Sequence, residues 1–480
     1  MPNDSMLQFV VRDQAYPAKR TAADRADDFR EIADRYAVPN AEDQAGRCSQ
    51  CGVPYCAVHC PLHNHIPDWL RLTAEGRLRE AYELSNATST MPEICGRICP
   101  QDRLCEGNCV IEFSGHGAVT IGSVERFITD KAWDEGWVEP LVPGPPRGQS
   151  VGVIGAGPAG LSAAEYLRGH GYDVHVYDRH DRAGGLLTYG IPGFKLEKPV
   201  VMRRVDRLKA GGIVFHESFA VGDDATLDDL RQRHDALLIA TGVYRPRAME
   251  VAGSDAAGVI GALDYLTASN RKGFGDAVPA FDSGALDAAG KHVVVIGGGD
   301  TAMDCVRTAL RQGAASVKCL YRRDRANMPG SQREVAHAEE EGADFVWLSA
   351  PHAFAGAERV ASVQVRKMRL GPPDASGRRA PEHDPGGDYA VPADMVIKAL
   401  GFDAEDLPTL FGAPELGVTR WGTVLVDAKT LMTSLDGVFA AGDIVRGASL
   451  VVWAIRDGRD VSAAMHKYLK VKAANARQAA

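Results

Sequence analysis

The sequence contains no long block of lysine or arginine, and no apolar run approaches the roughly 18 residues that a membrane-spanning helix needs. The formal net charge is -9, and no basic stripe is interleaved with aromatic residues, which argues against a nucleic-acid or anionic membrane surface. Residues 1–13 lack the basic start and apolar stretch of a secretion signal. We therefore expect a cytoplasmic protein that binds neither nucleic acid nor membrane.

Cysteine is almost absent from most of the chain. Eight of the ten cysteines lie between Cys48 and Cys109, and only Cys305 and Cys319 lie elsewhere. Without a secretion signal, such crowding indicates metal or cluster ligation rather than disulfides. The two isolated cysteines fall in an apolar helical pattern and an apolar strand, so we expect buried, inert thiols there.

Length and composition indicate several folded domains. Hydrophobic residues make up 45% and charged residues 24% of the 480 residues, which is ordinary for globular proteins, and we expect three domains. Residues 1–145 form the first, with helical spacing of apolar residues over 67–85 and a Pro/Gly-rich linker at 140–148. Two strand–helix–strand patterns follow, and the Pro/Gly/Asp-rich stretch 371–387 predicts an exposed hairpin or loop.

A G-x-G-x-x-G fingerprint stands between the first apolar strand pattern and its helix, at Gly155, Ala156, Gly157 and Gly160. Gly155 allows a tight turn, Gly157 lets the backbone approach a pyrophosphate, and Gly160 lets helix and strand pack closely. Asp178 ends the next strand, where an acid usually hydrogen-bonds a ribose hydroxyl. The pattern predicts a dinucleotide without a 2′-phosphate, the alternative being a simple glycine turn.

A second fingerprint, of the G-x-G-x-x-A type, lies between the later strand and helix patterns, with Gly297, Gly299, Asp300, Thr301 and Ala302. The strand that follows ends in Arg322 and Arg323 instead of an acid. Guanidinium groups suit a dianionic 2′-phosphate, so this site is predicted to bind NADPH rather than NADH. The alternative is that both arginines are solvated surface residues.

Three stretches, 183–192, 240–242 and 437–443, resemble segments of the two-dinucleotide flavoprotein reductases. The resemblance implies FAD at the first fingerprint, beside Gly185, Leu186, Lys195, Thr241, Gly442 and Asp443. It also implies an α/β fold in which a helical N-terminal iron-sulfur domain precedes two Rossmann-like domains. The FAD domain would comprise 146–247 and 406–480, and the NADPH domain 248–405. The alternative to a FAD contact is that Asp443 is an ordinary turn aspartate, and for Lys195 that it is an ordinary surface lysine.

The clustered cysteines form two quartets: Cys48, Cys51, Cys56 and Cys60, then Cys95, Cys99, Cys105 and Cys109. Closely spaced thiolates, followed by proline after Cys60 and after Cys99, suit two [4Fe-4S] clusters. Two structural zinc sites would need similar spacing, so spacing alone leaves zinc open. The adjoining flavin and nucleotide units favour iron-sulfur chemistry, because they supply electrons that zinc could not use.

The N-terminal part also resembles the dihydropyrimidine dehydrogenases, and that resemblance implies how the ligands divide. One cluster would be held by Cys48, Cys51, Cys56 and Cys109, and the other by Cys60, Cys99 and Cys105. The last corner in that family is a glutamine, where this sequence offers Glu125. The final ligand is therefore open between Glu125 and Cys95.

Over nearly its whole length the chain resembles the glutamate synthase small (β) subunits, most specifically at residues 95–109 and 328–331. The resemblance implies a hetero-oligomer with a large (α) subunit that holds the glutamine amidotransferase and the site where 2-oxoglutarate is aminated. This chain, which begins Met1-Pro2, lacks an amino-terminal cysteine nucleophile for that amidotransferase. No catalytic side chain is predicted, since positioning suffices for hydride transfer. The alternative is a subunit of a ferredoxin-linked NAD(P)H oxidoreductase or transhydrogenase that uses the same module.

Overall fold

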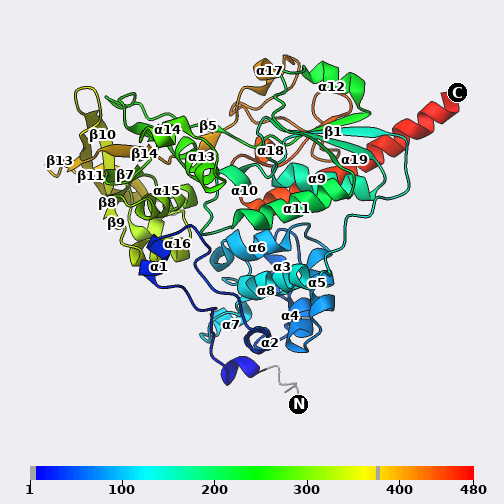
Figure 1. Cartoon of the computed structure of the whole chain (residues 1–480), viewed down its shortest axis with the longest axis horizontal. Helices are drawn as coiled ribbons and strands as arrows, with labels where there is room; N and C mark the ends of the chain where they lie inside the picture. Colours follow the sequence, from blue (N-terminus) through cyan, green and yellow to red (C-terminus); the bar gives the residue numbers. More distant parts are fainter. Residues whose placement is uncertain (1–6, 375–378, 480) are drawn as a thin grey trace.

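The computed structural model describes residues 7–374 and 379–479, which form a helical domain and two α/β domains (Figure 1). The helical domain, here the cysteine domain, lies at the bottom of the view. The two α/β domains lie above it, the first to the right and the second to the left. This arrangement confirms the predicted fold class. None of the helices in these ranges is both long and apolar enough to cross a membrane.

The cysteine domain is built from short helices: η1 (Gln8–Val10), α1 (Ala22–Ala26), α2 (Val38–Ala45), α3 (Tyr55–Val58), α4 (Ile66–Ala74), α5 (Leu78–Asn86), α6 (Pro92–Ile98), η2 (Gln101–Arg103), α7 (Val110–Phe113) and α8 (Ile121–Asp134). The helical pattern over 67–85 forms two helices rather than one. Gly76 adopts φ +73, which turns the chain between α4 and α5. Trp69 and Val124 lie in the buried core that these helices share.

The first α/β domain contains a parallel five-stranded sheet of order β16-β4-β1-β2-β3. Its elements are β1 (Ser150–Ile154), α9 (Pro158–Gly169), β2 (Asp173–Tyr177), α10 (Leu186–Tyr189), α11 (Lys198–Ala210), β3 (Val214–His216), α12 (Leu227–Arg233), β4 (Ala236–Ile239), α17 (Leu407–Leu410), β16 (Val438–Ala440), α18 (Asp443–Arg446) and α19 (Val451–Ala479). The edge strand β16 and helix α19 come from the end of the chain, and α19 packs along α9.

The second α/β domain contains a parallel sheet of order β6-β14-β7-β8-β9. Its elements are β6 (Val259–Gly261), α13 (Ala262–Gly273), α14 (Pro279–Asp282), β7 (His292–Ile296), α15 (Asp300–Arg311), β8 (Ser316–Tyr321), η3 (Arg325–Asn327), α16 (Gln332–Glu340), β9 (Asp344–Trp347) and β14 (Met395–Lys398). A short antiparallel pair, β5 (Arg245–Pro246) with β15 (Phe402–Asp403), joins the two α/β domains.

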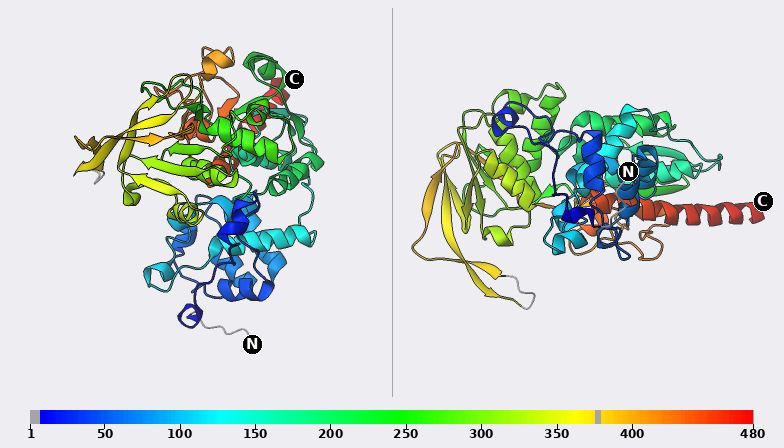
Figure 2. Two further views of the ribbon diagram at one scale, coloured as in Figure 1. Left: turned by 60° about the vertical axis from the view of Figure 1, so that its left-hand side comes forward. Right: turned by 90° about the horizontal axis from the view of Figure 1, so that it is seen from below.

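A smaller antiparallel sheet extends from the second α/β domain and comprises β10 (Ser349–Ala355), β11 (Ser362–Pro373), β12 (Arg379–His383) and β13 (Tyr389–Pro392). The segment for which we predicted an exposed hairpin or loop, 371–387, contains the end of β11 and all of β12, and these two strands project from the body of the protein (Figure 2). Residues 375–378 of that segment lie outside the described residues.

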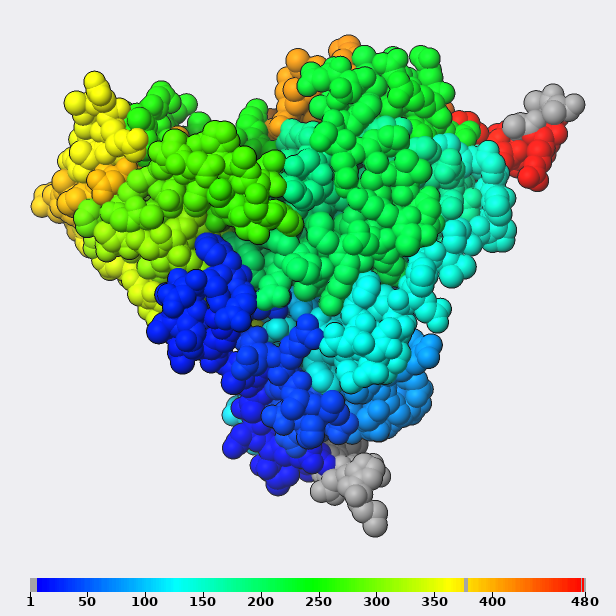
Figure 3. All heavy atoms as spheres, viewed as in Figure 1, coloured from blue at the N-terminus to red at the C-terminus, as the bar shows by residue number. Residues whose placement is uncertain are grey.

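The N-terminal segment, residues 8–37, crosses from the cysteine domain to the second α/β domain, and Figure 3 shows it in dark blue over their junction. We call this segment the strap. In α1 of the strap, Arg25 pairs with Glu341 at 3.1 Å. Glu341 also accepts hydrogen bonds from Arg307 at 2.9 Å and from Arg311 at 2.6 Å. Both guanidinium groups lie over the ring of Phe194 in the first α/β domain, so one buried charge cluster joins parts of both α/β domains and the strap.

Candidate functional site

The first glycine fingerprint forms an open loop between β1 and α9. Gly155 adopts φ +108, and a Cβ there would lie 2.4 Å from the carbonyl oxygen of Ala240. A Cβ on Gly160 would lie 1.9 Å from the carbonyl oxygen of Gly155, so helix and strand approach as the fingerprint predicts. Gly157 faces open space, since a Cβ there would meet no atom within 4 Å. The loop therefore leaves backbone accessible to a ligand where a pyrophosphate is expected.

Asp178 lies at the end of β2 with its carboxylate turned to the loop. It accepts hydrogen bonds from the backbone N–H groups of Ala156 at 2.7 Å and His180 at 2.8 Å. One role of this acid is thus to hold the fingerprint loop itself. Its predicted contact with a ribose hydroxyl stays a prediction.

The other residues predicted at the first site gather at the carboxyl ends of its strands. A Cβ on Gly185, which precedes Leu186 and α10, would lie 2.9 Å from the Cα of Gly157. The buried Thr241 hydroxyl has no hydrogen-bond partner among the described residues. Asp443 follows Gly442, which adopts φ +80, and burial raises the pKa of Asp443 to about 6. An unpartnered hydroxyl and a half-buried carboxyl at the carboxyl ends of these strands fit a polar dinucleotide such as FAD.

The second fingerprint repeats this geometry between β7 and α15. A Cβ on Gly297 would lie 2.3 Å from the carbonyl oxygen of Ala399, whereas Gly299 faces open space. Ala302 is fully buried, and Asp300 and Thr301 form the amino end of α15. The loop is therefore accessible at its second glycine and closed elsewhere, as a pyrophosphate site requires.

Arg322 and Arg323 follow β8 with different environments. Arg322 is exposed, whereas Arg323 is only 9% exposed and its Nε has no hydrogen-bond partner in the described parts of the chain. The alternative that both are solvated surface residues is wrong for Arg323. A buried guanidinium with an unused donor fits an anionic ligand such as a 2′-phosphate.

The eight clustered cysteines line two small cavities. The first is bordered by Cys48, Cys51, Cys56 and Cys109, and the second by Cys60, Cys95, Cys99 and Cys105. Neither cavity corresponds to a quartet in sequence order, because Cys60 and Cys109 exchange places. Burial raises the pKa of the Cys48 thiol to about 12, so a thiolate there needs a positively charged group to stabilise it. The donor set thus fits iron-sulfur clusters.

Glu125, on α8, also borders the second cavity. Burial, followed by the charge of Glu93, raises the pKa of Glu125 to about 8. Three thiols near this carboxyl also have raised pKa values. Burial is the main cause for Cys60 and Cys105, and the contact with Cys95 is the main cause for Cys99. The charge of Glu125 adds a smaller increase to all three. The carboxyl therefore faces the same space as these thiols.

A larger cavity, of about 570 Å³, lies where the three domains meet. The cysteine domain contributes Cys99, the first α/β domain contributes Ile191 and Ser449, and the second contributes Thr301. A group bound in this cavity would contact both nucleotide-binding domains and also Cys99, which borders the second cysteine cavity. We call it the central cavity.

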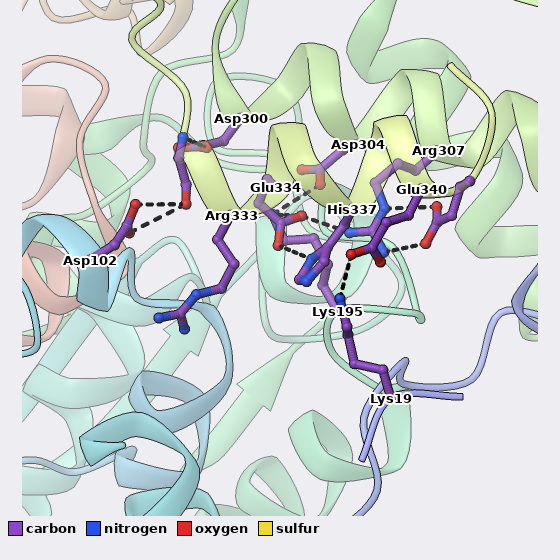
Figure 4. Close-up of polar contacts among 12 residues, drawn as sticks. Lys19, Asp102, Lys195, Asp300, Asp304, Arg307, Arg333, Glu334, His337 and Glu340 are labelled. Atoms are coloured by element: carbon purple, nitrogen blue, oxygen red, sulfur yellow. Dashed lines mark hydrogen bonds and ion pairs between the residues drawn. The ribbon is translucent and has the colours of Figure 1, made fainter. Parts of the chain in front are cut away.

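A buried network of charges forms one wall of the central cavity (Figure 4). The ammonium of Lys195 lies 3.0 Å from the carboxylate of Asp304 and 3.7 Å from that of Glu334. Arg307 donates to Glu334 at 2.7 Å, and the Nδ1 of His337 lies 3.4 Å from the same carboxylate. Lys195 is thus a cavity residue, and the surface alternative for it is wrong.

These charges perturb one another. Burial raises the pKa of Asp304 to about 6, against the opposing effect of Lys195. Burial alone would lower the pKa of Lys195, but the carboxylates of Asp304 and Glu334 outweigh it and raise the pKa. Sequence reasoning missed Asp304, Glu334 and His337. Asp304 could have been found from the sequence, because positions 300, 304, 307 and 311 are all polar and share one face of α15.

Two family models match the chain. Residues 25–137 match dihydropyrimidine dehydrogenase domain II, 4Fe-4S cluster, and residues 149–458 match the pyridine nucleotide-disulphide oxidoreductases. The first match supports iron-sulfur over zinc in the cysteine domain. The second covers both α/β domains.

Curated relatives match over almost the full length. The chain is 64% identical over 473 residues to the glutamate synthase [NADPH] small chain of Azospirillum brasilense, covering 98% of each chain. It is 44% identical over 476 residues to the protein of that name from Escherichia coli, covering 98% of this chain and 100% of the relative.

A solved structure supports the fold of the two α/β domains. Mycobacterium tuberculosis FprA in complex with NADPH aligns with a TM-score of 0.57 at 19% identity, covering 69% of this chain and 86% of FprA. At this identity the likeness concerns the fold alone.

Proposed function

The chain belongs to the family of NADPH-dependent glutamate synthase small chains, and on that premise we propose that it takes electrons from NADPH and delivers them to a large chain. The large chain converts L-glutamine and 2-oxoglutarate to L-glutamate. The observation that carries this proposal is the central cavity, where both nucleotide-binding domains and the second cysteine cavity meet.

When bound, FAD would accept an electron pair as hydride and release single electrons, which [4Fe-4S] clusters can carry. The residues of the chain bind, orient and shield these groups. We assign FAD to the first fingerprint, with Gly157, Thr241 and Asp443 as contacts, because open backbone and an unpartnered hydroxyl lie together there. We assign NADPH to the second fingerprint, with Arg323 on the 2′-phosphate. No side chain is assigned a catalytic role, since holding the reacting rings in place accounts for most of the expected acceleration.

We assign two clusters to the two cysteine cavities. Cys48, Cys51, Cys56 and Cys109 would hold the first, and Cys60, Cys99 and Cys105 three corners of the second. For the fourth corner we favour Glu125 over Cys95. Glu125 is half-buried and borders the same cavity as the three thiols, and none of the ion pairs found among the described residues includes it. A buried carboxylate without a counter-ion is costly unless a cation such as iron pairs with it.

Paired substitutions test this assignment. In anaerobically purified protein, Glu125→Ala should lower the iron content and change the electron paramagnetic resonance of one cluster, whereas Cys95→Ala should retain both clusters. The opposite result would assign the corner to Cys95. About eight irons per chain are expected from two cubanes of four irons each.

The large chain would bind near the first cysteine cavity. Apolar side chains are exposed around it, with Phe113 73% and Val53 60% exposed, and Tyr55 and Val110 at the cavity edge. Exposed aromatic and aliphatic residues grouped in this way are typical of an interface. We expect Phe113→Asp to weaken binding of the large chain at least tenfold, a typical loss for an interface anchor. Trp421→Ala, which alters a 64% exposed residue of the first α/β domain, should leave binding unchanged.

Reconstitution tests the function as a whole. The chain alone should oxidise NADPH with an artificial electron acceptor, and glutamate should form only after its large chain is added. Failure of the large chain to restore glutamate formation would contradict the proposal. Efficient reduction of ferredoxin by the chain would support the ferredoxin-linked alternative instead.

A further inference from the structure

The short loop between Cys99 and Cys105 contacts the second α/β domain directly. A guanidinium nitrogen of Arg103 donates to the carbonyl oxygen of Pro329 at 2.6 Å. The hydroxyl of Ser331 donates to the carboxylate oxygens of Asp102 at 3.2 and 3.3 Å. The segment that joins two proposed ligands of one cluster therefore also holds residues 328–331 of the nucleotide-binding domain.

Residues 328–331 pack with their other side on the second glycine fingerprint. The N–H of Gly330 donates to the carbonyl oxygen of Gly298 at 2.9 Å, and the N–H of Ser331 donates to the carboxylate of Asp300 at 2.9 Å. A Cβ on Gly330 would lie 3.1 Å from that carbonyl oxygen, so the contact is close. Three layers follow one another: the cluster loop, residues 328–331, and the fingerprint. Figure 4 shows Asp102 and Asp300 on the two sides of this middle layer.

A carboxylate, that of Asp300, lies at this junction where an anionic ligand is expected to bind. Asp300 is the first residue of α15, and the amino end of that helix is where the fingerprint predicts a pyrophosphate. A carboxylate beside a pyrophosphate is repulsive unless a cation lies nearby. Burial lowers the pKa of Lys195 in the first α/β domain, and the charge of Asp300 helps to raise it, after the carboxylates of Asp304 and Glu334. A guanidinium nitrogen of Arg103 lies 3.7 Å from the Asp300 carboxylate. Arg103 comes from the cysteine domain.

We propose that the cysteine domain completes the NADP(H) site, with Arg103 supplying positive charge at the amino end of α15 and Asp102 fixing residues 328–331. This inference rests on the proposed function. Because both residues lie between Cys99 and Cys105, binding of the dinucleotide and reduction of the second cluster influence each other. Linkage makes this coupling reciprocal: the factor by which reduction changes NADP⁺ affinity equals the factor by which NADP⁺ changes the reduction equilibrium.

Equilibrium binding of NADP⁺ to the oxidised holoprotein tests the first part without turnover. Loss of a partly exposed charge contact is worth up to about 1 kcal/mol, so Arg103→Ala should weaken NADP⁺ binding about fivefold. It should weaken NAD⁺ binding by the same factor, since both dinucleotides share the pyrophosphate. Arg103→Lys should recover part of the affinity. Arg79→Ala, which removes an exposed arginine paired with Glu83 in the same domain, is the matched control and should bind normally.

The reduction potential of the second cluster, followed by electron paramagnetic resonance, tests the coupling. A fivefold difference in NADP⁺ affinity between protein with the cluster oxidised and protein with the cluster reduced corresponds to about 40 mV for a one-electron couple, and NADP⁺ should shift the wild-type potential measurably, on this order. Ser331→Ala removes the hydrogen bonds to Asp102 without changing any residue of the cluster loop. This variant should reduce the shift in potential that NADP⁺ causes.

Unchanged NADP⁺ affinity in Arg103→Ala, with normal iron content, would overturn the role of Arg103. A wild-type potential that does not respond to NADP⁺, or a full shift in Ser331→Ala, would overturn the coupling. Failure of the wild type to bind NADP⁺ at all would instead overturn the proposed function, and this inference with it.

Discussion

Replacing Glu341 by glutamine should destabilise the second α/β domain more than any exposed charge substitution there. Glu341 is buried and accepts from Arg307 and Arg311, while Arg25 of the strap lies 3.1 Å away. Burial alone would raise its pKa, but the hydrogen bonds from the two arginines outweigh burial and lower the pKa from 4.5 to about 2. A shift of that size corresponds to about 3 kcal/mol of stability at neutral pH.

The sign of this contribution follows from the lowered pKa. The stabilisation is complete above about pH 4.5 and is lost as the pH falls towards 2. Removing one partner of a buried ion pair typically costs about 3 to 5 kcal/mol, which agrees with the value from the pKa. At pH 7 the thermal midpoint of the domain should fall by about 10 °C, at about 2 to 4 °C per kcal/mol for a domain of this size.

Circular dichroism during heating measures this midpoint. Glu339→Gln is the control, because Glu339 pairs with Arg325 at 2.7 Å on the exposed side of the domain, where such a pair contributes at most about 1 kcal/mol. Equal shifts for the two variants would refute the reasoning, since burial and the number of arginine partners would then make no difference.

Three further substitutions test the sites. Arg323→Ala should weaken NADPH binding about tenfold and leave NADH binding nearly unchanged, because only NADPH carries the 2′-phosphate; equal losses in a fluorescence titration would contradict that assignment. Gly157→Val should abolish FAD retention while the second fingerprint still binds NADP⁺, which flavin content and NADP⁺ titration would show. Burial raises the pKa of Asp304 from 3.8 to about 6, so its contribution to stability becomes less favourable as the pH rises from about 4 to about 6 and levels off above that. Asp304→Asn should therefore gain thermal stability relative to wild type as the pH rises from about 4 to about 6, and a constant difference over that range would exclude this explanation.

The parts of the site that the sequence could predict depend on local chain geometry. Gly155 and Gly297 must be glycine because of their positive φ and close carbonyl contacts, and both constraints act within one strand–turn–helix unit. Strand and helix patterns around them were likewise visible, and the predicted fold class is confirmed. The break at Gly76 was less visible, since a single glycine within an apolar pattern is compatible with a continuous helix.

The parts that could not be predicted depend on contacts between domains. Lys195 and Glu334 are far apart in sequence and meet only because both α/β domains face the central cavity. The positions of Arg322 and Arg323 relative to solvent depend on how β8 ends against its neighbours, so the pattern could not tell the exposed arginine from the buried one. The spacing of the cysteines does not determine which cavity each one borders. The exchange of Cys60 and Cys109 was predicted only from the resemblance to the dihydropyrimidine dehydrogenases.

The elements β16 and α19 belong to the first α/β domain but follow the second α/β domain in the sequence, and this order affects folding during synthesis on the ribosome. Strand β4 ends at Ile239, but its neighbour β16 begins only at Val438, after the whole second α/β domain has been made. At about 5 to 20 residues per second, the edge of the first sheet waits roughly 10 to 40 s for its partner strand. The second α/β domain, completed by β14, is therefore available to fold first, and the pocket containing Asp443 is assembled only after that domain has been synthesised.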